Sequence, residues 1–507
     1  MKISLFNLVR TIYWDDRENI ELEMLQTILE KSYEVSIYNL SEQEFEDINF
    51  LEFECNVAVF MIDFNADYVT IENIYSFSKK LKEKSNSETK IILIGYRAWL
   101  NRQEILDECD CFDYIIEGEV EDACKEIDSI CNLLMPQKEK KGIPELSKLA
   151  WAKRDKKLLS DLKYAKIRTT RGCNGNCLFC IDKGCVGITK IRDMTDVANE
   201  IDNIISNYSI KKISFYDNSF EDPDYVDKSR IREFLGIIKK NNWKIYFDCS
   251  VRAESFKNQS DFELLKEMSE CGFYKMVIGF ESGYTKDLEF FNKRATVDDN
   301  IRIAKFLNDC HISYSMPPGF IMFHPFSSKE SLKQNYNLLL ELRKGYSMLA
   351  VCSFLKVFPK SKMHEILISN ELSNVNVSYN NLVQYEYYNK EITQLAQFLF
   401  EKRYTSRTVE IGLFIDKMKE VLAMVKKDFT IWNRVSDFEE DIENIARELT
   451  ELVKVFFVNA LDNIENEEYI HDSYRELEEK SSKLKERTIM KKFVLYNINN
   501  EELRFIL

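Results

Sequence analysis

The chain has 507 residues, a length that predicts roughly two to four domains, each with its own hydrophobic core. Hydrophobic residues make up 45% of it and charged residues 31%, which is ordinary for a soluble globular protein. A formal net charge of −15 argues against general nucleic-acid binding, which needs a basic surface, and the lack of any run of about 18 apolar residues argues against a membrane span.

The cysteine content bears on the cellular compartment. The chain begins with a strand-like run at 3–9 and lacks the cleavage pattern of a secretory signal peptide. Thirteen cysteines in a chain without such a signal indicate reduced thiols rather than disulfides. We therefore expect a cytoplasmic protein with no membrane partner.

Residues 1–135 alternate between strand-like and helical patterns. The strand-like runs lie at 3–9, 34–39, 57–62, 90–95 and 114–118, with helical periodicity between them, as at 21–31 and 71–84. This alternation predicts an α/β domain with a doubly wound, Rossmann-like parallel sheet covered by helices on both faces. Ligands of such sheets bind at the carboxyl ends of the strands, where this sequence has Gly95 and the run Gly118-Glu119-Val120-Glu121.

Residues 136–162 are highly charged and predict a linker, after which residues 163–360 alternate again with a period of about 30 residues. Strand-like runs lie at 166–170, 212–216, 244–249, 275–280, 314–323 and 349–358. Helical patterns separate them, at 196–205, 229–240, 261–270, 298–308 and 329–344. These six β/α units predict a partial TIM-type (β/α)6 barrel, and the chemistry of such barrels takes place at the carboxyl ends of the strands.

Three cysteines, Cys173, Cys177 and Cys180, follow the first of these strands in one short loop. Glycines at 172 and 175 tolerate the backbone angles that let the loop curl around one centre. Soft thiolates packed this tightly favour an iron–sulfur cluster or zinc over hard cations. A structural zinc site normally has four protein ligands, and this loop supplies three. Cys185 could supply a fourth, which leaves a closed structural or electron-transfer centre as an alternative.

The C-x-x-x-C-x-x-C spacing, with Phe179 before the last cysteine, resembles the signature of radical S-adenosylmethionine (SAM) enzymes. The resemblance implies a [4Fe–4S] cluster on Cys173, Cys177 and Cys180, with Phe179 beside the cofactors and one iron free to chelate SAM. It also implies that an electron from an external flavodoxin- or ferredoxin-like donor cleaves SAM. The resulting 5′-deoxyadenosyl radical would abstract a hydrogen atom from the substrate.

The ends of the later strands extend the resemblance. Asp217 and Ser219 lie in a D-x-x-F run like the family segment that holds the amine of SAM. Ser250 and Arg252 end the third strand, where Arg252 could pair with the carboxylate or ribose region of SAM. Glu281, in a G-x-E-S-G run, is expected to bind ribose hydroxyls or to orient a second cofactor. The alternative for Asp217 and Glu281 is an ordinary helix cap.

Two further residues have competing interpretations. His324 replaces the aspartate of a G-F-I-M-F-D-P run in the family, and we expect a structural histidine there. Cys352 lies on the sixth predicted strand. In this enzyme class a cysteine facing the substrate can return a hydrogen atom to a substrate radical, but a free thiol is more commonly a small buried hydrophobe.

Residues 361–507 predict a helical cap over the barrel. Apolar residues recur there at helical spacing on two faces. The first face holds Ile411, Phe414, Ile415, Met418, Leu422 and Val425, and the second holds Ile442, Ile445, Leu449, Leu452 and Phe456. Residues 471–492 predict a solvated helix, and the runs at 493–496 and 503–507 predict a terminal pair of strands.

The first domain also resembles a known type. Its position before the barrel and its G-E-x-E ending at 118–121 are similar to cobalamin-binding domains fused to radical SAM enzymes. The resemblance implies cobalamin contacts at Gly95, Gly118 and Glu119. The D-x-H-x-x-G motif that supplies an axial histidine in many cobalamin proteins is absent, which leaves an empty, vestigial domain as the alternative.

These interpretations give three candidate functions. The leading one is a cobalamin-dependent radical SAM enzyme, most simply a C-methyltransferase acting on an unactivated C–H of a natural-product or peptide substrate. The second is cobalamin-free radical hydrogen transfer, such as peptide epimerisation with Cys352 as the hydrogen donor. The third is a noncatalytic iron–sulfur or zinc protein closed by Cys185. The acidic charge disfavours methylthiolation of transfer RNA.

Overall fold

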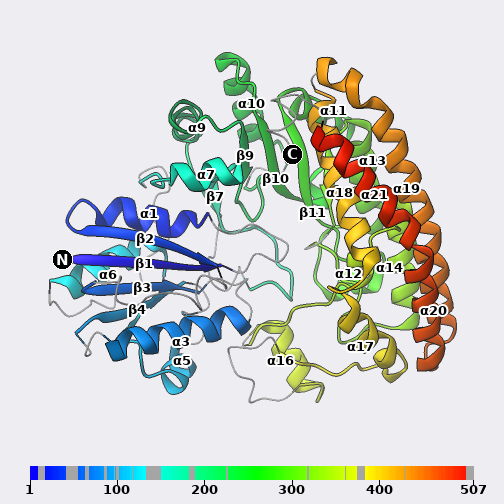
Figure 1. Cartoon of the computed structure of the whole chain (residues 1–507), viewed down its shortest axis with the longest axis horizontal. Helices are drawn as coiled ribbons and strands as arrows, with labels where there is room; N and C mark the ends of the chain where they lie inside the picture. The colour runs from blue at the N-terminus through cyan, green and yellow to red at the C-terminus, as the bar shows by residue number, and fades with distance from the viewer. Residues whose placement is uncertain are drawn as a thin grey trace.

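The computed structural model describes residues 1–9, 18–41, 55–62, 68–84, 88–95, 98, 102–116, 118–132, 150–181, 189–223, 226–316, 319–359, 361–373, 383–427 and 429–497. In Figure 1 an N-terminal α/β unit is followed by a central α/β core and then by long C-terminal helices. This arrangement confirms the predicted fold class. None of the described helices is both long and apolar enough to span a membrane.

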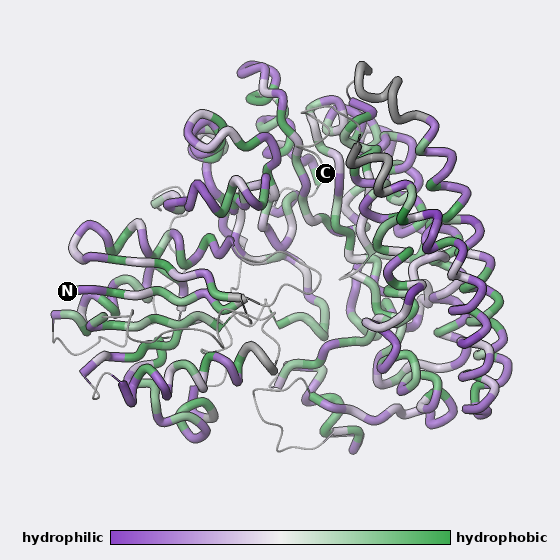
Figure 2. The backbone as a smooth tube through the Cα atoms, viewed as in Figure 1, coloured by the Kyte–Doolittle hydropathy of each residue, from purple (hydrophilic) through white to green (hydrophobic). Residues whose placement is uncertain are grey.

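Five parallel strands make the N-terminal sheet, in the order β2-β1-β3-β4-β5. They are β1 (Lys2–Val9), β2 (Glu34–Ser41), β3 (Val57–Met61), β4 (Lys90–Ile94) and β5 (Tyr114–Ile115). Helices on the two faces are α1 (Ile20–Leu29) and α6 (Val120–Cys131) on one, and α3 (Tyr68–Lys84) and α5 (Arg102–Glu108) on the other (Figure 1). Side chains of β1 alternate, so Leu5 packs toward α1 and α6 while Phe6 packs toward α3. The strands are mostly hydrophobic, as a sheet buried on both faces requires (Figure 2).

The central core holds a second parallel sheet, in the order β12-β11-β10-β9-β6. Its strands are β6 (Ala165–Ile167), β9 (Lys212–Phe215), β10 (Tyr246–Arg252), β11 (Phe273–Gly279) and β12 (Ser313–Ser315). The helices of this part are α9 (Met194–Tyr208), α10 (Ser229–Asn241), α11 (Gln259–Glu270), α12 (Thr285–Phe290), α13 (Val297–Asp309) and α14 (Lys329–Glu341). Two isolated parallel bridges, Glu281 with Phe320 and Phe323 with Phe354, continue the arc. This open arc of parallel strands matches the predicted partial barrel.

The last two predicted barrel strands are largely wrong. In the described residues of the strand expected at 314–323, pairing is limited to β12 and to bridges at Phe320 and Phe323. The strand expected at 349–358 begins instead as helix α15 (Met348–Val351) and pairs only at Phe354. Ser347 starts this helix, because its side chain accepts a hydrogen bond from the backbone N–H of Ala350. A short apolar run fits a buried strand or a buried helix, and here the capping serine favours the helix.

The second half of the predicted linker is structured. Helix α7 (Lys156–Leu162) begins after Asp155, whose side chain accepts a hydrogen bond from the N–H of Leu158 at 3.2 Å. Before this helix, the backbone oxygen of Trp151 accepts a hydrogen bond from Thr27 Oγ1 at 2.9 Å. Because Thr27 belongs to α1, residues 150–162 contact the N-terminal unit rather than lying free between two domains.

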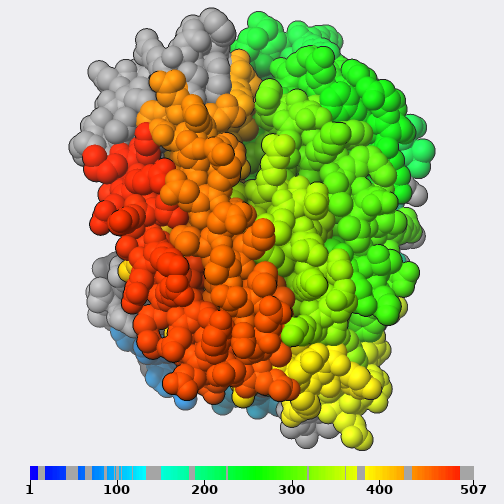
Figure 3. Space-filling model, turned by 90° about the vertical axis from the view of Figure 1, so that its right-hand side faces the viewer, coloured from blue at the N-terminus to red at the C-terminus, as the bar shows by residue number. Residues whose placement is uncertain are grey.

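The C-terminal helices are α16 (Lys362–Ser369), α17 (Thr393–Lys402), α18 (Arg407–Val425), α19 (Phe429–Asp462), α20 (Glu467–Lys480) and α21 (Ser482–Asn497). Helix α18 packs against β11 and β12, and α19 to α21 form one face of the molecule beside the core (Figure 3). The two predicted apolar faces join the same hydrophobic core as the barrel. The predicted strand at 493–496 is wrong, because α21 continues through it without a glycine or proline to stop it. Its expected partner at 503–507 lies outside the described residues.

Candidate active site

The cysteine loop follows β7 (Thr170–Arg171), which pairs antiparallel with β8 (Lys190–Ile191). Cys173 and Cys177 are half-buried and Cys180 is exposed. A Cβ placed on Gly175 would stand 3.2 Å from Cys173 Sγ and 3.9 Å from Cys177 Sγ. Both sulfurs therefore face the open side of this glycine, and the loop leaves there the space that a side chain would fill. That geometry leaves room for a group bound by these two sulfurs.

Two cations lie beside the thiols. Burial raises the pKa of Cys173 to about 11, and the guanidinium of Arg252 opposes this rise. Burial also raises the pKa of Cys177, against the charges of Lys293 and Arg252. Across the described ranges, no three His, Cys, Asp or Glu side chains, the three loop cysteines included, are grouped closely enough to hold a metal ion. Cys185, the candidate fourth ligand, falls outside those ranges.

Asp217 joins the ends of β6 and β9. Its carboxylate accepts hydrogen bonds from the N–H of Thr169 at 2.7 Å, from the N–H of Thr170 at 2.9 Å and from Thr169 Oγ1. Burial raises the pKa of Asp217, and these hydrogen bonds oppose the rise. Its contacts fix the backbone that leads into the cysteine loop, and SAM binding by Asp217 stays a prediction. Two residues further on, Ser219 Oγ is buried with no hydrogen-bond partner in the described part of the chain.

Arg252 connects the third barrel strand to the cysteine loop. Its Nη2 lies 2.5 Å from Asp222 Oδ1, and its Nε lies 3.3 Å from Glu221 Oε1. The other oxygen of Asp222 accepts a hydrogen bond from the backbone N–H of Asn174, between the first two cysteines, at 2.8 Å. Ser250, predicted to bind the cofactor with Arg252, is half-buried, and its carbonyl oxygen accepts from the N–H of Phe220 at 2.8 Å. The sequence prediction missed these acidic partners and a third, Glu254, whose Oε1 lies 3.7 Å from Arg252 Nε.

Glu281 pairs with a lysine that the sequence analysis did not identify. Its Oε1 lies 3.2 Å from Lys293 Nζ, and both side chains are buried. A Cβ on Gly279 would stand 2.7 Å from Glu281 Oε1 and 3.2 Å from Lys293 Nζ, so the pair lies directly over that glycine. Burial alone would lower the pKa of Lys293, but Glu281 and Cys177 outweigh it and the pKa is raised. Lys293 is therefore a cation held next to the cysteines.

Phe179 and His324 have packing partners. The ring of Phe179 meets that of Phe291 edge to face, with centroids 5.3 Å apart. The backbone N–H of Leu178 donates to the oxygen of Phe291 at 3.0 Å, so this residue anchors the middle of the loop. His324 is buried beside the Phe291 ring, with Nε2 3.1 Å from Asp287 Oδ1. These surroundings agree with the structural role expected for His324.

Cys352 ends helix α15 and does not lie on a strand. It is buried, and burial raises the pKa of its thiol, while Arg403 opposes the rise. The pKa of Tyr474 in α20 is raised, mainly by burial, and Cys352 contributes to the rise. Helix α15, which Cys352 ends, packs against α18 of the C-terminal helices. A hydrogen-donor role for Cys352 stays a prediction.

The carboxyl ends of the N-terminal strands carry polar side chains. Asn7 Nδ2 donates to Asn39 Oδ1 at 2.8 Å, and Asn19 Nδ2 lies 3.4 Å from Asn7 Oδ1. Gly95 has a φ of +108°, and a Cβ there would stand 2.3 Å from the backbone oxygen of Ile62. Only glycine permits this approach of the ends of β3 and β4.

At the end of β5, Glu119, which was predicted to contact cobalamin, pairs with an arginine of the core. Gly118 has a φ of +107° and turns the chain into α6. Glu119 has its Oε2 3.2 Å from Arg171 Nη1 of the core. Cobalamin contacts at Gly95, Gly118 and Glu119 stay predictions.

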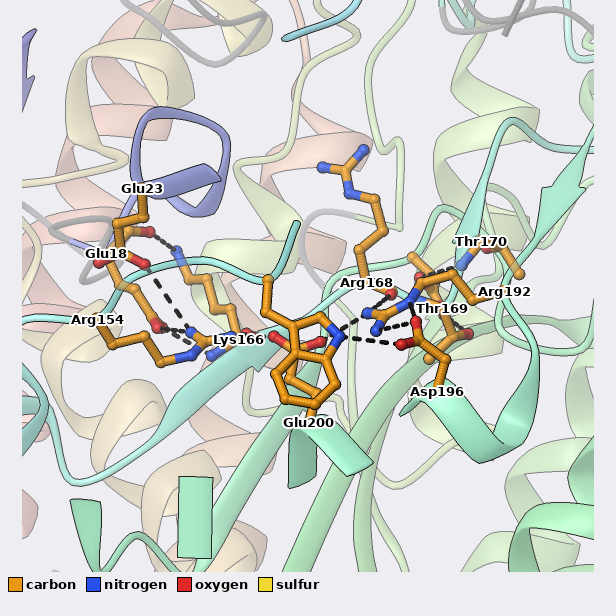
Figure 4. A network of polar contacts seen from close by, with 12 residues as sticks. Glu18, Glu23, Arg154, Lys166, Arg168, Thr169, Thr170, Arg192, Asp196 and Glu200 are labelled. Carbon is orange, nitrogen blue, oxygen red and sulfur yellow. Dashed lines mark hydrogen bonds and ion pairs between the residues drawn. The ribbon is translucent and has the colours of Figure 1, made fainter. Parts of the chain in front are cut away.

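A buried ion network joins the start of α1 to the core (Figure 4). Arg154 pairs with Glu18, and its Nη2 lies 2.9 Å from Glu200 Oε1. Arg192 Nη1 lies 2.7 Å from the other oxygen of Glu200. Burial and the negative charge of Glu18 raise the pKa of Glu23 to about 8, so Glu23 is mostly protonated at neutral pH.

Comparison with known proteins gives a consistent result. The family model for the radical SAM superfamily matches residues 167–339. An uncharacterized methyltransferase of Pyrococcus horikoshii is 23% identical over 319 residues, a match covering 58% of this chain and 66% of that protein, just under two thirds. The bacteriochlorophyllide d C-8(2)-methyltransferase of Chlorobaculum tepidum is 21% identical over 320 residues, covering 60% of this chain and 67% of that protein.

Two solved structures share the fold over most of the chain. OxsB, a cobalamin-dependent SAM radical enzyme with aqua-cobalamin and SAM bound, superposes with a TM-score of 0.67 at 14% identity over 99% of this chain and 82% of its own. The radical SAM methyltransferase TsrM from Kitasatospora setae superposes with a TM-score of 0.56 at 13% identity over 73% of this chain and 76% of its own. Residues 167–339 therefore form a radical SAM domain, and the chain has the fold of the cobalamin-dependent radical SAM enzymes.

Proposed function

We propose that this protein is a cobalamin-dependent radical SAM methyltransferase that modifies an unactivated carbon of a natural product or peptide. One observation carries the proposal: the cysteine loop lies directly against the carboxyl edge of a five-stranded parallel sheet, through the contact of Arg171 with Glu119. Ligands of doubly wound sheets bind at that edge. A cofactor at that edge would therefore lie near the thiolate loop, as transfer between two cofactors needs.

Different residues of the site would bind the cluster and SAM. Cys173, Cys177 and Cys180 would hold a [4Fe–4S] cluster, and the turn at Gly175 leaves room for it. Lys293, the cation near the cysteines, would bind the carboxylate of SAM. When bound, the cluster and SAM supply radical hydrogen abstraction, and cobalamin supplies a transferable methyl group. An external flavodoxin- or ferredoxin-like protein would supply the electron.

The competing functions have less support. Peptide epimerisation with Cys352 as donor needs a thiol facing the substrate, whereas this thiol is buried at the end of a helix that packs against α18. A noncatalytic iron–sulfur or zinc protein needs a fourth ligand such as Cys185, which lies outside the described residues. The methyltransferase proposal uses the N-terminal sheet, and the other two leave it without a role.

Anaerobic reconstitution tests the proposal. The protein is incubated with iron, sulfide and hydroxocobalamin, passed through gel filtration, and assayed for its visible spectrum and for SAM cleavage after reduction with dithionite. We expect co-eluting cluster and corrin and reductant-dependent SAM cleavage, with cleavage lost in Cys177→Ala. A cluster that cleaves SAM while corrin fails to co-elute would overturn the cobalamin part, and a cluster that never cleaves SAM would overturn the whole proposal.

A further inference from the structure

Arg171 is the last residue of β7, and only Gly172 separates it from Cys173. Its side chain is 1% exposed, and its guanidinium faces three carboxylates of the N-terminal unit. Nη1 and Nη2 contact the two oxygens of Glu121 at 2.8 and 3.1 Å, a bidentate pair. Nη1 also lies 3.2 Å from Glu119, and Nη2 lies 3.2 Å from Glu21. Arg171 is thus a core residue bound by the N-terminal unit.

The three carboxylates come from two places in the N-terminal unit. Glu119 and Glu121 lie in the turn from β5 into α6, at the carboxyl edge of the sheet, and Glu21 lies in the first turn of α1. Glu21 is shared with a second core arginine, since Arg168 Nη2 lies 3.0 Å from its Oε1. Burial would raise the pKa of Glu21, but Arg168 and Arg171 outweigh it and the pKa is lowered. Glu21 therefore stays ionised at neutral pH.

We propose that Arg171 is a positioning residue that holds the cysteine loop at a fixed place against the ligand edge of the N-terminal sheet, and that Glu119 and Glu121 serve as its anchor. The inference rests on the proposed function, because it concerns the relative placement of a cluster and a corrin. It also assigns the G-E-x-E run to contact between the two units rather than to a ligand.

The form of the contact supports positioning over stabilisation. Buried ion pairs are weak sources of stability, because desolvation of the charges offsets their attraction, but they penalise every arrangement that leaves a charge unpaired. A bidentate guanidinium–carboxylate pair also fixes orientation as well as distance. On its other side, Arg171 is paired in the ladder with Lys190 of β8, and Gly172 then turns the chain with a φ of +86°. Displacement of Arg171 would thus be passed to Cys173.

The test compares Arg171→Gln with Arg154→Gln in the full-length protein. Arg154 is a matched control, because its side chain is 2% exposed and it also joins the start of α1 to the core, but it lies before β6 and far in sequence from the cysteines. Each variant is reconstituted with iron, sulfide and hydroxocobalamin and then reduced. Pulsed EPR measures how strongly the reduced cluster enhances the relaxation of cob(II)alamin, a readout of the distance between them.

We expect both variants to lower the Tm, but only Arg171→Gln to reduce the relaxation enhancement relative to wild type. Glu121→Gln, a milder change, should reduce it in the same direction, and the effects of the two changes should not add in the double variant. Enhancement unchanged in both Arg171→Gln and Glu121→Gln, or equally reduced in Arg154→Gln, would overturn the inference. Absence of cluster or corrin from the wild type would instead overturn the proposed function.

Discussion

Lys293 Nζ lies 3.2 Å from Glu281 Oε1, and the two side chains are buried together over Gly279. Their pairing joins the end of the fourth barrel strand to the loop after α12. Because Cys177 also contributes to the raised pKa of Lys293, the same lysine lies within electrostatic range of the cysteine loop. The contact with Glu281 therefore holds the Lys293 cation near the cysteine loop, although these residues are separated in the sequence.

Replacing Lys293 by methionine is expected to affect both folding and cofactor binding. The change leaves Glu281 buried without its partner, which costs about 3 kcal/mol of unfolding free energy. It should also weaken SAM binding by about tenfold, the loss typical of one charge-assisted contact. Thermal unfolding and equilibrium dialysis with SAM measure the two effects. Lys293→Arg keeps the charge and is the control; SAM affinity unchanged in Lys293→Met would remove this lysine from the site.

Gly175→Ala is expected to lower the iron content without unfolding the protein. The added Cβ would stand 3.2 Å from Cys173 Sγ, in the space toward which two sulfurs face. Gly236 in α10 is the matched control, since a Cβ there meets nothing within 4 Å and should stabilise the helix by up to about 1 kcal/mol. Iron and sulfide analysis after reconstitution checks both. Full cluster loading in Gly175→Ala would show that the cluster does not occupy this space.

The pKa of Glu23 predicts a pH dependence of stability. Its folded pKa of about 8 lies above the unfolded value near 4.5, so the folded state binds the proton more tightly. The stability from this group is therefore complete below about pH 4.5 and is lost as the pH rises to about 8, by at most about 1.4 kcal/mol per pH unit. Glu23→Gln should flatten the fall of Tm between about pH 6 and 8. Glu30→Gln, at the more exposed end of the same helix, should leave the slope unchanged, and an equal slope in Glu23→Gln and wild type would contradict the assignment.

Cys352→Ala is expected to keep catalytic activity. The thiol is small and buried in the main hydrophobic core, so its loss should cost only about 1 kcal/mol of stability. Cys352→Ser should cost more, about 2 kcal/mol, because it buries a hydroxyl in an apolar setting. Product formation and SAM cleavage are measured together. Intact SAM cleavage with product formation abolished in Cys352→Ala would restore the hydrogen-donor role.

The sequence was sufficient where the signal is local and periodic. Alternating apolar runs predicted both parallel sheets, and the spacing of Cys173, Cys177 and Cys180 placed the loop after a strand, as the structure has it. It was insufficient where a short apolar run fits two structures. Residues 349–358 begin as a helix because Ser347 caps it, and residues 493–496 continue a helix that no residue stops.

Pairings between distant residues could not be predicted either. Arg171 meets Glu121 across 50 positions of sequence, and Lys293 reaches Glu281 only because α12 returns the chain over Gly279. Arg171 and Lys293 have no local sequence feature that sets them apart from the other charged residues, which make up 31% of the chain. Tertiary packing selects these pairs, so a motif such as G-E-x-E can be recognised without its partner being known.

The most direct test of the account is the EPR spectrum of the reduced, reconstituted protein with and without SAM. A cluster held by Cys173, Cys177 and Cys180 has one iron free of protein ligands, so we expect its g values to shift when SAM is added. The same spectrum in Cys177→Ala should lack the cluster signal. A wild-type cluster whose g values are unchanged by saturating SAM would mean four protein ligands, and would contradict the proposed radical chemistry.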